Sequence, residues 1–213
     1  YNSGFVDQGY GGVGIGSDAG RTNQANAGTA IGSASGYLNQ GGLATAVGAD
    51  SGKYNQAGSA VAIGNQAGMG SATVGDFQGA NAVAIGYQAG KATQGASSVS
   101  VGYYAGNNTQ GTYAVAIGNQ SGATTQGNYG VAVGYNAGAT IQGSNCVAVG
   151  VSAGTTSQGA NSVAVGGAAG NSTQGTQATA IGYYAGTTAQ GTNSVAVGYE
   201  AGKTTQGTSS IAV

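Results

Sequence analysis

The sequence lacks the residue types on which most protein chemistry depends. Its 213 residues include no His, Pro or Trp, only four Lys or Arg and five Asp or Glu, and the net charge is −1. Acid–base pairs, Ser-His-Asp triads and His-containing metal sites therefore lack the groups they need. Four basic residues are too few for a nucleic-acid-binding stripe, and no stretch approaches the roughly 18 apolar residues of a membrane span. We expect no enzyme activity, no cofactor or metal, no nucleic-acid partner and no membrane insertion.

Glycine, in contrast, accounts for 46 residues. Disordered Gly-rich chains are usually also rich in Pro and charge, which this chain is not, and collagen needs Gly at every third position. The single Cys146 excludes a disulfide framework within the chain. The glycines must therefore belong to a different regular structure.

A sixteen-residue repeat orders the glycines. Its clearest marker is a Gln followed by a small residue, which recurs at sixteen-residue intervals with one step of twenty-two. The repeat glutamines are Gln8, Gln24, Gln40, Gln56, Gln78, Gln94, Gln110, Gln126, Gln142, Gln158, Gln174, Gln190 and Gln206. The longer step predicts an inserted loop over 69–77 between regular coils over 1–68 and 78–213. We expect 1–213 to be one repeat array, and a segment of a longer fibre because the last repeat stops one residue before its Gly.

Each repeat ends in a short strand signal. In residues 162–166, for example, the β-branched Val163 and Val165 alternate with small residues, and Gly166 follows. No segment has a helical period, and sixteen residues are too few for a leucine-rich repeat or a propeller blade. The sequence thus predicts an all-β protein, a parallel β-solenoid or β-roll of about thirteen sixteen-residue coils.

Two columns of β-branched residues enclose a column of small ones in these strands. We number the sixteen positions of each repeat so that position 16 is its strand-ending Gly. Position 1 is then the residue that follows the Gly of the preceding repeat. Val, Ile or Thr occupies position 13, Val or Ile position 15, and position 14 holds only Ala, Gly or Ser. Adjacent coils of a solenoid lie about 4.8 Å apart, so we expect the β-branched columns to form continuous ribs inside the coil. The small column then points to the opposite face. It fits either a tight contact inside one coil or close packing against another chain, and we favour the second, which predicts an oligomeric fibre or filament. The candidate interchain face comprises Ala84, Ala116, Ala132, Ala148, Ala164, Ala180 and Ala196.

Stacking also accounts for the scarcity of charge. A charged column would place like charges about 5 Å apart, whereas stacked amides can bond to one another. We therefore expect the Gln column to be a partly buried amide ladder.

We expect Gly at position 4 to adopt positive φ in a turn. Three acid/base pairs flank that turn on the predicted solvent-exposed rim: Asp18 with Arg21, Asp50 with Lys53 and Glu200 with Lys203.

Tyrosine supplies the candidate binding residues. These are Tyr87, Tyr103, Tyr104, Tyr135, Tyr183, Tyr184 and Tyr199. They suit stacking along an edge of the fibre, or a row that grips a host-surface glycan or protein. The two positions before the repeat Gln are often Thr, and a regular row of hydroxyl groups suggests ice binding as a further interpretation. Other residues interrupt these two columns at Ile141, Ala189 and Asn108.

The strand motifs carry a family resemblance. Residues 161–166 and 193–198 read NSVAVG, and residues 81–86 read NAVAIG. They resemble the NSVAIG-type repeats in head domains of YadA-like trimeric autotransporter adhesins, and similar repeats in phage and viral tail or surface fibres. The resemblance implies a left-handed β-roll, three chains packed side by side, and an extracellular, cell-surface or virion-surface location. We expect a non-catalytic structural fibre or adhesin segment, with a repeat-lattice binding module for glycan or ice as the alternative.

Overall fold

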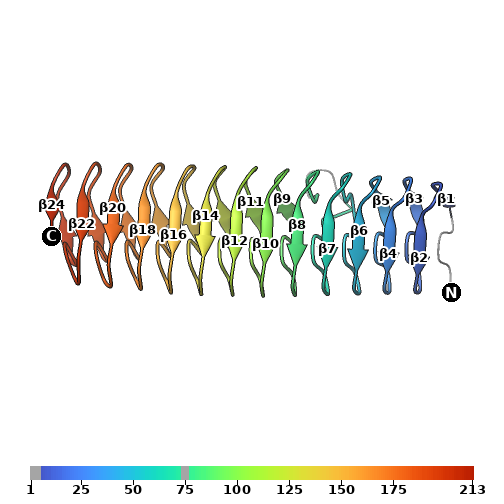
Figure 1. The fold of residues 1–213 in the computed structure, drawn as a ribbon, viewed down its shortest axis with the longest axis horizontal. Coiled ribbons are helices and arrows are strands. Elements are labelled where there is room, and N and C mark those ends of the chain that lie inside the picture. Colours follow the sequence, from blue (N-terminus) through green and yellow to red (C-terminus); the bar gives the residue numbers. More distant parts are fainter. Residues whose placement is uncertain (1–5, 73–76) are drawn as a thin grey trace. The chain divides into compact units, whose positions relative to one another are not determined.

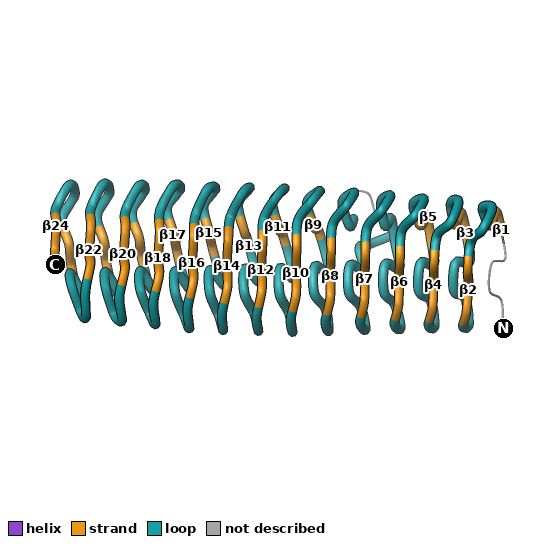
Figure 2. The backbone as a smooth tube through the Cα atoms, in the orientation of Figure 1, coloured by secondary structure: helices purple, strands orange, loops and turns teal. Residues whose placement is uncertain are grey.

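The computed structural model describes residues 6–72 and 77–213. They divide into two compact parts, Tyr1–Thr112 (the N-terminal part) and Tyr113–Val213 (the C-terminal part). Every regular element in the described residues is a β-strand of two or three residues, and each part is a stack of flattened coils (Figures 1 and 2). The prediction of an all-β parallel solenoid is confirmed.

Each coil contributes positions 13–15 to one sheet, which we call the valine sheet. In the N-terminal part this sheet contains β2 (Val13–Ile15), β4 (Thr29–Ile31), β6 (Thr45–Val47), β7 (Val61–Ile63), β8 (Val83–Ile85) and β10 (Val99–Val101). In the C-terminal part it contains β12 (Val115–Ile117), β14 (Val131–Val133), β16 (Val147–Val149), β18 (Val163–Val165), β20 (Thr179–Ile181), β22 (Val195–Val197) and β24 (Ile211–Ala212).

The opposite wall of the coils contains strands of two or three residues that end at the repeat Gln. They form two separate sheets, and we call this wall the glutamine sheet. In the N-terminal part its strands are β1 (Val6–Gln8), β3 (Thr22–Gln24), β5 (Leu38–Gln40), β9 (Thr93–Gln94) and β11 (Thr109–Gln110). In the C-terminal part they are β13 (Thr125–Gln126), β15 (Ile141–Gln142), β17 (Ser157–Gln158), β19 (Thr173–Gln174), β21 (Ala189–Gln190) and β23 (Thr205–Gln206).

The register follows the repeat directly. Within each part the described strand pairs are parallel. A residue faces its equivalent sixteen positions later, as Val147 faces Val163. Between β7 and β8 the step is twenty-two, with Val61 facing Val83, so the six additional residues leave the valine sheet uninterrupted there. Residues 73–76 of the predicted loop 69–77 lie outside the described residues, and the single continuous array over 1–213 stays a prediction.

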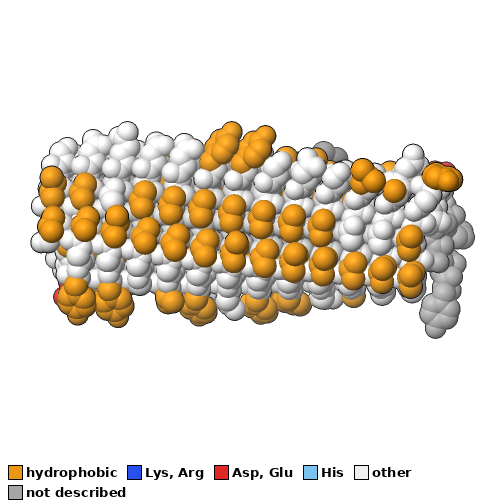
Figure 3. All heavy atoms as spheres, in the orientation of Figure 1, with side chains coloured by type: hydrophobic (Ala, Val, Ile, Leu, Met, Phe, Trp, Pro, Cys, Tyr) orange, Lys and Arg blue, Asp and Glu red, His pale blue; other side chains and the backbone are white. Residues whose placement is uncertain are grey.

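The structure reverses the predicted faces of the valine sheet. All seven alanines of the candidate interchain face, Ala84, Ala116, Ala132, Ala148, Ala164, Ala180 and Ala196, are fully buried inside their own chain. The β-branched residues face outward instead: Ile117 is 40% exposed and Ile181 is 41% exposed. Figure 3 shows rows of hydrophobic side chains that run across neighbouring strands on this face. The predicted interchain role of these alanines, and the predicted internal position of the Val/Ile ribs, were therefore wrong.

The width of the coil is the physical reason for this reversal. In the C-terminal part the core is a cluster of alanines from positions 14 and 3, for example Ala148, Ala164 and Ala169. Position 12 adds further buried small residues such as Ser162 and Ser194. Between two sheets joined by such short turns, only methyl groups and the Gln side chain fit, and larger β-branched residues would overpack the interior.

The turns depend on positive φ at glycine and at other residues. Gly90 at position 4 has φ of 53°, in the positive region that the sequence predicted. Positions 2 and 11 also adopt positive φ without Gly, as at Tyr104 (56°), Asn161 (58°) and Asn193 (55°). Asn tolerates this conformation better than most residues, so its recurrence at position 11 was the available signal.

We expect Gly150→Ala to destabilise the C-terminal part by about 3 kcal/mol, since both strain and a clash contribute. Gly150, at position 16, has φ of 129°, and an added Cβ would lie 2.7 Å from the carbonyl oxygen of Gly166. Gly198→Ala is the matched control. Gly198 has φ of 122°, but its Cβ would meet no atom closer than 4.0 Å. The midpoint of urea denaturation should therefore be clearly lower for Gly150→Ala than for Gly198→Ala. Equal midpoints would contradict a role for the close approach between coils.

Candidate functional site

The repeat glutamines span the interior of the coil from the glutamine sheet to the valine sheet. Gln142, which is 1% exposed, donates from Nε2 to the carbonyl oxygen of Val131 at 2.8 Å. The equivalent bond to the carbonyl of position 13, 2.6 to 2.9 Å long, is made by Gln24, Gln40, Gln56, Gln78, Gln94, Gln110, Gln126, Gln158, Gln174, Gln190 and Gln206. Each Gln thus ties the two sheets together, a role that the sequence did not indicate.

The glutamines also bond to one another along the stack. In the C-terminal part Gln126 donates to Gln142 at 3.0 Å, Gln142 to Gln158 at 3.1 Å, and Gln174 to Gln190 at 3.1 Å. In the N-terminal part four such bonds join Gln8, Gln24, Gln40, Gln56 and Gln78 in sequence. The expected amide ladder is present over these steps. It is interrupted at Gln94, Gln174 and Gln206, whose buried Oε1 atoms accept no hydrogen bond.

Reactive groups are few and separate. The described residues contain no cluster of three or more His, Cys, Asp or Glu that could hold a metal ion. They also contain no helix that is long and apolar enough to cross a membrane. Cys146 is fully buried at position 12, with its Sγ 2.9 Å from the carbonyl oxygen of Gly159 and 3.6 Å from Ser162 Oγ. It fills the place that Ser162 and Ser194 occupy in other coils, and its burial leaves no room for a partner thiol.

The three acid/base pairs lie on the rim, as predicted. The shortest nitrogen–oxygen distances are 3.8 Å for Arg21 and Asp18, 2.9 Å for Lys53 and Asp50, and 2.7 Å for Lys203 and Glu200. The hydrogen bond to Asp50 raises the pKa of Lys53, and that to Glu200 raises the pKa of Lys203. All six side chains are partly exposed, so the pairs add little to stability.

The candidate tyrosines form two separate groups and one single residue. In the N-terminal part the ring of Tyr103 lies 5.4 Å from that of Tyr87 and 4.5 Å from that of Tyr104. In the C-terminal part the ring of Tyr183 lies 4.3 Å from that of Tyr184 and 6.0 Å from that of Tyr199. The binding role of these tyrosines and of Tyr135 stays a prediction.

The comparisons with known proteins point to one family. The family model described as "YadA head domain repeat" matches two segments of the chain, residues 110–137 and 174–201. No curated protein and no solved structure matches the chain. The second segment includes the NSVAVG motif at 193–198, one of those that carry the resemblance seen in the sequence. Over these two segments the chain is similar to the YadA head domain, as its strand motifs predicted.

Proposed function

We propose that the chain is a non-catalytic structural segment of a homo-oligomeric surface fibre, whose chains pack through the outer face of the valine sheet. YadA head repeats and a parallel β-solenoid fit an adhesin or structural fibre segment, and YadA-like head domains are exposed at cell surfaces. A virion surface is the alternative location. The resemblance supports three chains as the oligomer.

The outer face of the valine sheet is the observation that carries this proposal. Parallel sheets are normally covered on both faces, yet in a single chain only the alanine side is covered. The outer face presents two columns of Val, Ile or Thr, and position 15 is open enough that Ile85, Ile117 and Ile181 are each at least 36% exposed. Contiguous exposed apolar surface of this kind marks an interaction site.

A second copy of the chain is the partner that fits this face best. Its Val/Ile columns repeat at the same spacing of about 4.8 Å per coil, so the ribs of one chain can fit between those of another along many coils. The columns carry no charge, and the chain as a whole has a net charge of −1, so repulsion between copies is small.

Light scattering on the purified chain tests the proposal. A trimer should have three times the monomer mass of 20.0 kDa. Ile181→Lys should reduce the mass to that of the monomer while the β-sheet circular dichroism remains, because a charge would enter the interface. Thr173→Lys places the same charge on the exposed glutamine-sheet face of the same coil and should leave the mass unchanged. A monomeric wild-type chain, or equal masses for the two variants, would refute the assembly.

A repeat-lattice module that binds glycan or ice is the alternative function. The exposed tyrosine groups at Tyr87 and Tyr103 and at Tyr183 and Tyr199 support the glycan form of this alternative. It stays a prediction beside the structural role.

A further inference from the structure

We propose that the N-terminal part carries a binding site for a carboxylate-bearing sugar, in a pocket formed beside the insertion. The pocket has a volume of about 400 Å³, within the usual range for small-ligand sites. Its lining comes from three successive coils: Tyr54 from the first, residues 69–72 from the second, and Lys91 and Ala92 from the third. This inference goes beyond the fibre role and does not depend on the oligomeric state.

The pocket arises because the glutamine sheet is interrupted here. Gln78 forms isolated bridges with Gln56 and Gln94 in place of a strand. The three coils nevertheless stay in register at the edge of the pocket. The backbone N–H of Tyr54 donates to the carbonyl of Met69 at 2.9 Å, and that of Gly70 to the carbonyl of Lys91 at 2.8 Å. These two bonds hold the backbone of Tyr54, Met69 and Lys91 in place beside the pocket.

Lys91 supplies the charge that selects the ligand. The other three basic residues, which share position 5 with Lys91, are each paired with an acid at position 2. In the repeat of Lys91, position 2 is the neutral Gln88, and Lys91 forms no ion pair within the part of the chain that the structure describes. An unpaired ammonium at the wall of a pocket favours an anionic group.

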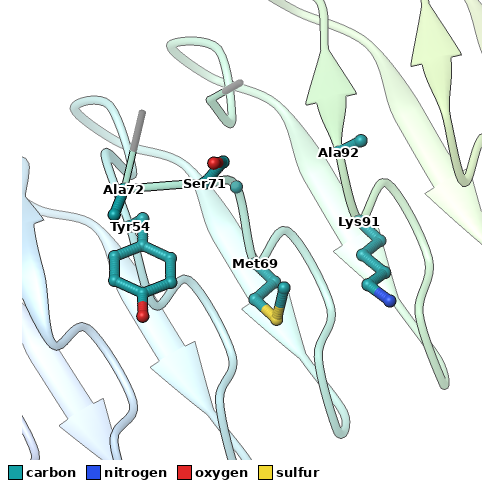
Figure 4. Close-up of a pocket in the computed structure, with 7 residues that line it drawn as sticks. Tyr54, Met69, Ser71, Ala72, Lys91 and Ala92 are labelled. Carbon is teal, nitrogen blue, oxygen red and sulfur yellow. The ribbon is translucent and has the colours of Figure 1, made fainter. Parts of the chain in front are cut away.

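Tyr54 supplies the surface for an apolar or sugar face. Its ring meets Tyr37 of the preceding coil edge-on, with ring centroids 6.1 Å apart, and Nζ of the adjacent Lys53 lies 5.3 Å from its centroid. Figure 4 shows the side chains of Tyr54, Met69 and Lys91 projecting in the same direction. An aromatic ring fixed in this way offers rigid amphipathic contact at low entropic cost.

The spacing of the two groups suits a single acidic sugar. Tyr54 and Lys91 are two coils apart, which is about 10 Å at the strand spacing, with Met69 between them. A pyranose ring can lie against Tyr54 and Met69 while its carboxylate reaches the Lys91 ammonium. A neutral sugar would lose the ion pair, and a small carboxylate such as acetate would lose the ring contacts.

The test is a titration of the full chain with methyl glucuronide, methyl glucoside and acetate by isothermal calorimetry and ligand-observed NMR. The glucuronide should bind at least about tenfold more tightly than the neutral glucoside or acetate, and less tightly as salt rises. Lys91→Gln should weaken glucuronide binding about tenfold. Lys203→Gln changes the lysine at the same position in another coil and should have no effect. Ala92→Phe should block binding by filling the pocket.

Three results would each overturn the site. They are equal affinity for glucuronide and glucoside, unchanged glucuronide binding by Lys91→Gln, or no glucuronide binding by the wild-type chain at 10 mM, a concentration at which about 1 mM affinities are readily measured. Affinity for acetate equal to that for glucuronide would overturn the sugar part of the proposal. Melting curves of Lys91→Gln and Ala92→Phe should match the wild type, because both side chains are only partly buried and border the pocket.

Discussion

Lysine in place of Ala164 should unfold the central coils of the C-terminal part. Ala164 is 0% exposed and packs among Ala148, Ala169 and Ala180 in the alanine core. An added Cβ on Gly170 would already lie 3.3 Å from the Ala164 methyl group, so the coil has no space for a longer side chain. Burial of an unpaired ammonium and overpacking together should cost about 5 kcal/mol or more. Circular dichroism during urea denaturation would measure the loss.

Val165→Lys is the matched control because it changes the adjacent residue on the opposite face of β18. Val165 faces outward, so its lysine can reach solvent and the β-sheet signal of the chain should remain. The expected loss in this variant is assembly, through the outer face of the valine sheet. If Ala164→Lys instead kept its fold and lost only assembly, the alanines would face another chain after all.

The repeat predicted the fold because a solenoid is periodic along one direction. The sixteen-residue spacing set the parallel register of Val147 and Val163, and the unbroken Gln column predicted the amide ladder at Gln126, Gln142 and Gln158. Both follow from identical residues stacked at a fixed interval. The register and the ladder can therefore be predicted without knowing the cross-section of the coil.

The orientation of the valine sheet could not be predicted by the usual rule. Alternation separates two faces of a strand, and larger apolar residues are normally assigned to the interior. The choice here depends on the distance between the two sheets, which the strand pattern does not contain. A signal was available in the small residues at positions 3 and 12, such as Ala169 and Ser162, because they mark a narrow interior together with position 14.

The candidate site was only partly visible in the sequence. The insertion and the position of Lys91 could be read there, but the closeness of Tyr54, Met69 and Lys91 depends on how the chain leaves the glutamine sheet. The stacked pair Tyr113 and Tyr129, with ring centroids 5.3 Å apart, was also missed. Both occupy position 11, and their sixteen-residue spacing was the available signal.

Leucine in place of Gln142 should destabilise the C-terminal part strongly, because it removes three buried hydrogen bonds. It keeps the approximate volume but removes the donor to the Val131 carbonyl, the donor to Gln158 Oε1 at 3.1 Å, and the acceptor for Gln126 at 3.0 Å. Buried groups left without partners cost about 1–3 kcal/mol each, so we expect a loss of about 3 kcal/mol in urea denaturation. Gln206→Leu, at a residue that is 8% exposed and whose Oε1 accepts no bond, should cost clearly less.

Glutamate at the same position separates hydrogen bonding from side-chain volume. In Gln142→Glu the buried carboxyl should have a pKa above its usual value of about 4.3, because burial disfavours the charged form. Its protonated form is neutral and can still donate to the Val131 carbonyl. A raised pKa in the folded chain makes the variant most stable at low pH, and this stability falls as pH rises above about 4.3 and the carboxylate must ionise inside the coil. Gln142→Leu should show no such pH dependence relative to the wild type. If both variants matched the wild type at all pH values, the column would hold the sheets apart by volume alone and not join them by hydrogen bonds.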